Sequence, residues 1–154
     1  TSFARLPIIA ALLTASTLII GALVAGLNAG LIFNTFPLMD GQVIPDRLFR
    51  VPLTNWLDTP MTIQFTHRIF AYATLSTLYY MAWRGRKELL SSKGRKLLIA
   101  AVSVGTLQVV LGVVTLLTRV QIHAAASHQF VAFILLAILV GLSYEATHGN
   151  ENTR

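Results

Sequence analysis

The chain alternates four long apolar runs with polar connecting segments. The apolar runs cover residues 6–33, 61–83, 97–117 and 127–144. A helix needs about 17–25 apolar residues to cross a bilayer, and every run is long enough. The pattern predicts an all-α, polytopic membrane protein. We expect one domain over residues 1–154, built as a bundle of four transmembrane helices.

Two connecting segments set the expected topology. The segment 34–60 holds four of the five prolines, Pro37, Pro45, Pro52 and Pro60, so it cannot be a spanning helix. The segment 84–96 carries half of the twelve Lys and Arg residues, namely Arg84, Arg86, Lys87, Lys93, Arg95 and Lys96. Short basic loops stay on the cytoplasmic or matrix side. We therefore expect both termini and the 84–96 loop inside, and the 34–60 loop outside.

Composition agrees with a membrane protein. The chain is 55% hydrophobic and 12% charged, about half the charged share of a soluble domain. A net charge of +6 would suggest a nucleic-acid partner in a soluble protein. Here half of the basic residues lie in one loop, so the positive charge is explained by the orientation of the chain in a membrane. No nucleic-acid partner is expected. The absence of cysteine excludes disulfides, thiolate metal sites and a cysteine nucleophile.

Two histidines, His67 and His128, lie near the starts of the runs 61–83 and 127–144. Both runs are expected to pass from outside to inside, which places the two imidazoles within about one helical turn in depth. Histidine is rare within membranes and usually functional there. Four interpretations compete: an imidazole bonded within the protein, a proton relay, a zinc or copper site, and a haem held between both rings.

The sequence favours the haem among these four. A relay usually recruits carboxylates, which the spans lack, and zinc or copper sites need three or four protein ligands. A haem needs two imidazoles and an apolar slot. Small residues in the other two runs, Gly26, Gly30 and Gly112, would leave room for a flat macrocycle.

Further polar residues near the same depth complete the candidate site. Arg68 and Arg119 lie at the outer level and are expected to pair with the propionates. Gln64 and Gln129 are close in sequence to the two histidines and are candidates for hydrogen bonds that orient them. His123 falls in the expected outer loop, so we expect it to be solvated.

Five segments carry a resemblance to a known family. They are GLNAG at 26–30, NTFPLM at 34–39, QFTHR at 64–68, LQVVLGVVTLL at 107–117 and HQ at 128–129. In order and spacing the chain resembles haem A synthase of the type found in mitochondria and related bacteria. The resemblance covers residues 21–133. Members of that family consist of two similar four-helix halves, each with a histidine pair.

The resemblance is to the second half of that family. The first half carries a catalytic glutamate three residues before its first histidine, and this chain has Gln64 there. Asn28 also replaces an aspartate expected in many members. The resemblance implies that His67 and His128 are the axial ligands of a haem b. No catalytic residue is assigned, and this half of an oxidoreductase is not expected to be catalytic alone.

The resemblance also implies a setting for the protein. The family oxidises haem O to haem A for cytochrome c oxidase biogenesis. The implied location is the mitochondrial inner membrane or the bacterial cytoplasmic membrane. The expected partners are lipid, a second four-helix half in the same or a separate chain, and cytochrome c oxidase assembly factors or a second copy. The alternative is a non-catalytic haem-binding or structural membrane subunit with the same fold.

Overall fold

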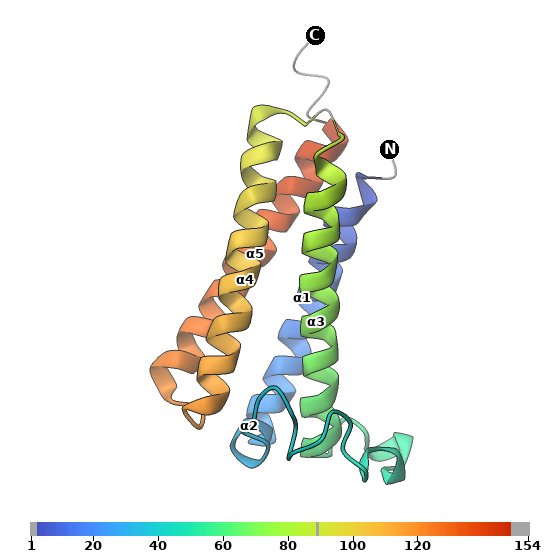
Figure 1. The fold of residues 1–154 in the computed structure, drawn as a ribbon, viewed down its shortest axis with the longest axis vertical. Helices are drawn as coiled ribbons and strands as arrows, with labels where there is room; N and C mark the ends of the chain where they lie inside the picture. The colour runs from blue at the N-terminus through green and yellow to red at the C-terminus, as the bar shows by residue number, and fades with distance from the viewer. Residues whose placement is uncertain (1–2, 89, 149–154) are drawn as a thin grey trace.

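The computed structural model describes residues 3–88 and 90–148, and within them the regular structure is helical, as the sequence predicts. The helices are α1 (Arg5–Gly26), α2 (Ala29–Ile32), α3 (Pro60–Gly85), α4 (Ser92–Leu117) and α5 (Ile122–His148), with short 3-10 turns at Leu48–Arg50 and Leu53–Asn55. The long helices run side by side as a bundle (Figure 1). Both ends of the chain lie at one end of the bundle, opposite α2 and the loop that follows it.

The order of the helices around the bundle determines which of them face each other. Both α1 and α4 pack against both α3 and α5. The helices α3 and α5 therefore occupy opposite corners, with α1 and α4 between them. This arrangement matters because the two candidate histidines lie on α3 and α5.

Three of the long helices in the described part of the chain, α1, α4 and α5, are long and apolar enough to cross a membrane. Helix α3 has the length, with 26 residues, but its first half is polar. Two of those polar residues, Thr62 and Gln64, are buried inside the bundle. Hydropathy averages over all faces of a helix, so it does not register that these side chains point away from lipid.

The main differences from the predicted boundaries are three. Helix α4 begins at Ser92 rather than at residue 97, so part of the expected basic loop 84–96 is helical. The apolar run 6–33, expected as one span, breaks after Gly26, and Asn28 adopts a left-handed backbone conformation with φ 52° before α2 begins. Asparagine is one of the residue types that tolerate this conformation. Helix α5 begins at Ile122 rather than near residue 127, so His123 lies in its first turn and not in a loop.

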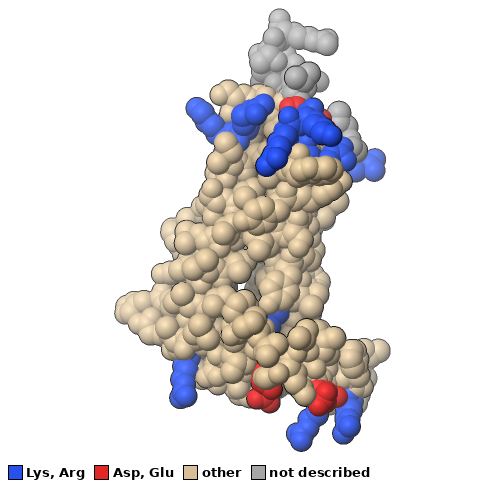
Figure 2. Space-filling view, in the orientation of Figure 1, with Lys and Arg blue, Asp and Glu red and all other residues tan. Residues whose placement is uncertain are grey.

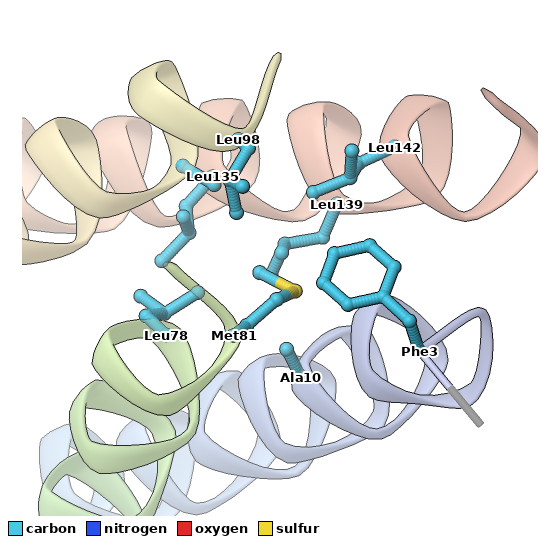
Figure 3. Close-up of a cluster of buried hydrophobic side chains, with 9 residues drawn as sticks. Phe3, Ala10, Leu78, Met81, Leu98, Leu135, Leu139 and Leu142 are labelled. Atoms are coloured by element: carbon cyan, nitrogen blue, oxygen red, sulfur yellow. The ribbon is translucent and has the colours of Figure 1, made fainter. Parts of the chain in front are cut away.

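The half of the bundle nearer the termini is filled by apolar side chains. One buried cluster combines Phe3, beside the start of α1, with residues from all four long helices (Figure 3). The buried cluster also contains Ala10, Leu78, Met81, Leu98, Ala101, Leu135, Leu139 and Leu142. Gly105 on α4 sits so close to the Leu78 side chain that a Cβ there would collide with it. This packed half fixes the helices relative to one another.

Polar contacts join α4 and α5 at the same end. The Ser91 hydroxyl accepts a hydrogen bond from the Gly94 backbone N–H (2.9 Å), which caps the start of α4, and it donates one to Glu145 Oε2 (3.0 Å). Lys93 Nζ lies 2.8 Å from Glu145 Oε1. Lys and Arg side chains gather at this end of the molecule (Figure 2). The expected basic loop therefore lies at the same end as both termini.

Replacing Ser91→Ala should destabilise this end of the bundle, because it removes both the helix cap and the bond to Glu145. The loss of an N-cap costs about 0.5–2 kcal/mol. The measurement is the free energy of unfolding, followed by circular dichroism during denaturation in mixed micelles. The matched control is Ser92→Ala, which changes the neighbouring exposed serine at the first helical position. Equal stabilities of the two variants would contradict the assigned cap.

Candidate functional site

We call the half of the bundle farther from the chain termini the outer half. It contains a cavity of about 340 Å³, lined by residues from all five α-helices. Both candidate histidines line it, His67 from α3 and His128 from α5. Because α3 and α5 stand at opposite corners, the two imidazoles enter the cavity from opposite sides. The space-filling view shows a gap in the surface of the bundle between its two ends (Figure 2). The structure thus brings together two residues that are 61 positions apart in the sequence.

His128 is held by the backbone of α4. Its Nδ1 lies 3.1 Å from the carbonyl oxygen of Gln108. When Nδ1 carries the proton it donates to that carbonyl, and Nε2 keeps its lone pair for a ligand. The ring also lies against Gly112, where an added Cβ would be only 2.9 Å from His128 Cε1. Glycine at this position is what lets the ring approach the helix backbone.

His67 has a similar neighbour on α1. An added Cβ at Gly21 would lie 3.1 Å from His67 Cε1. Within the described residues, however, His67 Nδ1 makes no hydrogen bond. The two histidines therefore occupy equivalent positions but are fixed to different degrees.

The glycines that accommodate the rings were only partly predicted. Gly112 was expected to leave room, and it does so. Gly21 was missed, although Thr17 and Gly21 have the same four-residue spacing as Gln108 and Gly112. Gly26 was expected to contribute, and this expectation is wrong: it is exposed, and a Cβ there would meet nothing within 4 Å.

Gly30 lines the cavity, but its contact is not with a histidine. A Cβ at Gly30 would lie 3.0 Å from the Val120 side chain, in the turn between α4 and α5. Gly30 thus allows α2 to pack closely against that turn. Its small size serves helix packing at the outer end of the bundle.

Buried polar atoms without partners gather around this cavity. Within the described chain they are Gln64 Oε1, His67 Nδ1, Arg68 Nε and Gln108 Oε1. All four residues line the cavity. Buried polar groups in folded proteins are nearly always hydrogen-bonded, to protein or to something bound. The residues therefore fit a ligand that is largely apolar and carries polar groups at its edge.

Arg68 is mostly engaged with the protein itself. We call residues 33–59, which connect α2 to α3, the outer segment. The two terminal nitrogens of Arg68 donate to four backbone carbonyls of this segment, at Phe33 (3.3 Å), Thr35 (2.7 Å), Pro37 (3.4 Å) and Leu38 (3.3 Å). It thereby ties the segment that follows α2 to α3, one residue from His67. Of its guanidinium nitrogens only the buried Nε remains without a bond, and Arg68 is one of the residues that line the cavity.

Some of the other predicted site residues line the cavity and some do not. Gln64 is buried and lines the cavity, and Gln129 also lines it from an exposed position on α5. Arg119 does not line the cavity; it lies exposed in the turn after α4, with φ 55°. His123 does not line it either and is exposed. The hydrogen-bond partner of His128 is the backbone carbonyl of Gln108 and not a glutamine side chain.

The ligand set distinguishes between kinds of metal site. In the described part of the chain, no three His, Cys, Asp or Glu side chains lie close enough together to hold a metal ion. Two imidazoles entering one apolar cavity match a metal whose remaining ligands belong to a macrocycle. Haem is the biological group of that kind, and the residues present fit it.

Comparison with known proteins shows which family the chain resembles. Residues 1–140 match the COX15-CtaA family model, described as cytochrome oxidase assembly protein. Heme A synthase of Agrobacterium fabrum is 44% identical over 137 residues, which cover 85% of this chain and 37% of the relative. Heme A synthase of Brucella anthropi is 42% identical over 132 residues, covering 84% and 37%. Heme A synthase of Brucella ovis is 39% identical over 132 residues, covering the same shares.

The similarity covers only part of each relative. The chain spans a little over a third of the length of these curated relatives. No solved structure matches it significantly.

Replacing Arg68→Leu should loosen the outer segment, because the four carbonyls lose their donors. A hydrogen bond from a charged group is worth about 1.5–3 kcal/mol, so hydrogen exchange should speed up by at least about tenfold. The amides to follow are those of Met39 and Asp40, which are bonded within this segment. Arg68→Lys should loosen it nearly as much, since an ammonium cannot reach all four carbonyls.

The matched control for this prediction is Arg50→Leu, which removes an exposed cation from the same outer segment. Its exchange rates at Met39 and Asp40 should equal those of the wild type. If Arg68→Leu also leaves these rates unchanged, the segment is held by other contacts. One such contact is the bond from Trp56 Nε1 to Thr66 Oγ1 (3.0 Å).

Proposed function

The chain belongs to the COX15-CtaA family of cytochrome oxidase assembly proteins, and from this premise we propose that it forms the haem b-binding, four-helix half of a haem A synthase. The observation that carries the proposal is the pair of histidines that enter one apolar cavity from opposite corners of the bundle. The similarity to proteins named Heme A synthase supports a role in haem A biosynthesis. The substrate would be haem O and the product haem A.

The residues of the cavity divide the task of holding the haem. His67 and His128 would supply the two axial nitrogens. The Gln108 carbonyl keeps the proton of His128 on Nδ1, which directs Nε2 toward the cavity. Gln64 Oε1 and Arg68 Nε offer polar contacts to the edge of the group. A haem bound in this way would supply a one-electron redox centre.

The cavity offers no group for acid or base catalysis by a carboxyl. Its lining contains no Asp or Glu, and Gln64 stands where the catalytic half has its glutamate. An amide neither accepts nor gives up a proton at physiological pH. We therefore propose that the oxidation takes place in a second four-helix half, in the same or a separate chain, and that this half supports it by electron transfer.

We also propose that α3 is the fourth transmembrane helix. It packs against α1 and α4. Of the polar residues in its first half, Gln64, His67 and Arg68 line the cavity. Thr62 and Thr66 bond to Trp56 of the outer segment. The gathering of cations at the end that carries the termini favours a cytoplasmic location for that end (Figure 2). Because the relatives are bacterial, the bacterial cytoplasmic membrane is the proposed location. Lipid and cytochrome c oxidase assembly factors are the proposed partners.

One observation favours a second candidate function. Gln64, in place of a carboxylate, is also what a non-catalytic haem-binding or structural membrane subunit would carry. The two functions differ in one requirement. The enzyme half needs a partner half with glutamate at the position that Gln64 occupies here, whereas the non-catalytic subunit does not.

The optical spectrum of the purified protein tests the proposed function. The wild type should show a six-coordinate, low-spin haem, because imidazole occupies both axial positions. His67→Ala and His128→Ala should each become high-spin or lose the haem. His123→Ala is the control and should keep the wild-type spectrum, since His123 is exposed and outside the cavity. Wild-type protein without haem, or a low-spin spectrum in both single variants, would overturn the proposal.

Cysteine labelling tests the orientation. The chain contains no cysteine, so each introduced thiol is unique. Val43→Cys places a thiol in the outer loop at a position that is 77% exposed, and Ser92→Cys places one beside the basic loop. In intact bacteria an impermeant maleimide should label only the first. Labelling of the second without permeabilisation would reverse the topology.

A further inference from the structure

Two glycines stand against the two candidate ligand rings, and they do so in the same way. On α4, Gly112 lies four residues after Gln108, whose carbonyl contacts the ring. On α1, Gly21 lies four residues after Thr17, and both residues line the same cavity. In an α-helix, residues four apart share one face. A side chain at the glycine would therefore stand between the ring and the carbonyl of the preceding turn.

We propose that Gly21 and Gly112 are positioning residues that seat the two histidine rings against the backbones of α1 and α4. The inference concerns this chain's own residues, and its consequence for haem rests on the proposed function. Gly112 lets His128 reach the Gln108 carbonyl, which fixes the ring's tautomer and its rotation. Gly21 lets His67 approach α1, but there Nδ1 remains without a bond. His128 is thus the firmly held ligand and His67 the one that can shift.

The contacts predict a graded response to substitution by alanine. A Cβ at Gly112 would be 2.9 Å from His128 Cε1, closer than real side chains approach, so the ring must move. A Cβ at Gly21 would be 3.1 Å from His67 Cε1, so that ring need move only a few tenths of an ångström. A Cβ at Gly26 meets nothing within 4 Å. The expected order of effect is Gly112, then Gly21, then Gly26.

Gly85 provides the control for packing alone. It lies at the end of α3, and a Cβ there would collide with Leu98 instead of a histidine. Neither Gly85 nor Leu98 lines the cavity. Gly85→Ala should therefore lower the thermal stability of the bundle without displacing a ligand.

The first measurement uses the haem-loaded protein. Gly112→Ala should change the g values of the low-spin electron paramagnetic resonance signal, which follow the strength and orientation of the axial rings. It should also release haem about three to ten times faster, as expected for one lost hydrogen bond. Gly21→Ala should produce smaller changes of both kinds. Gly26→Ala and Gly85→Ala should keep the wild-type g values, and wild-type g values in all four variants would overturn the proposal.

The second measurement needs no haem, and so separates this proposal from the proposed function. Nitrogen-15 resonances of labelled histidine in the haem-free protein should show His128 protonated at Nδ1 in the wild type and in Gly85→Ala. Gly112→Ala should lose that fixed tautomer. If it does so while the wild type binds no haem, the positioning role stands and the proposed function fails. If the wild type binds haem but the His128 tautomer is the same in Gly112→Ala, the positioning role is refuted.

Discussion

A polar side chain inside a bilayer has to find its partner within the protein, because lipid offers none. This requirement organises the outer half of the bundle. Helix α3 begins with Thr62, Gln64 and His67, residues that a lipid-facing helix would not tolerate, and the structure turns them toward the interior. The other long helices, which are apolar, surround them. The cavity is the place where the polar atoms left over from this arrangement meet.

Glycine has a different role in each half of the bundle. Toward the termini, leucines from α3, α4 and α5 close the interior, and Gly105 serves to bring Leu78 into contact with α4. Two turns further along α4, Gly112 serves to admit an imidazole. The packed half keeps the helices at fixed separations, and this rigidity is what allows the cavity to persist between them. A ligand site on such a scaffold can hold two rings in a defined geometry.

Arg68, beside a candidate ligand, mainly stabilises the fold. A cation one residue from a candidate haem ligand is expected to meet a propionate. In the structure its terminal nitrogens hold four carbonyls between Phe33 and Leu38, which connects the outer segment to α3. Only Nε is left for a ligand. Arg119, the second expected partner, lies exposed and does not line the cavity. Neither predicted arginine therefore offers an unbonded terminal nitrogen at the cavity.

The sequence alone determined the helical class, the membrane character, the histidine pair and the family, because these depend on composition, periodicity and motif spacing. The tertiary structure decided the rest. The break at Asn28, the role of Gly21, the carbonyl that holds His128 and the carbonyls that engage Arg68 all depend on how closely two helices approach. No pattern along one chain encodes that distance. The sequence predicted a span over residues 61–83, yet among the described helices only α1, α4 and α5 are apolar enough by composition to cross a membrane. The polar face of α3 would be acceptable in a membrane only after its neighbours have covered it.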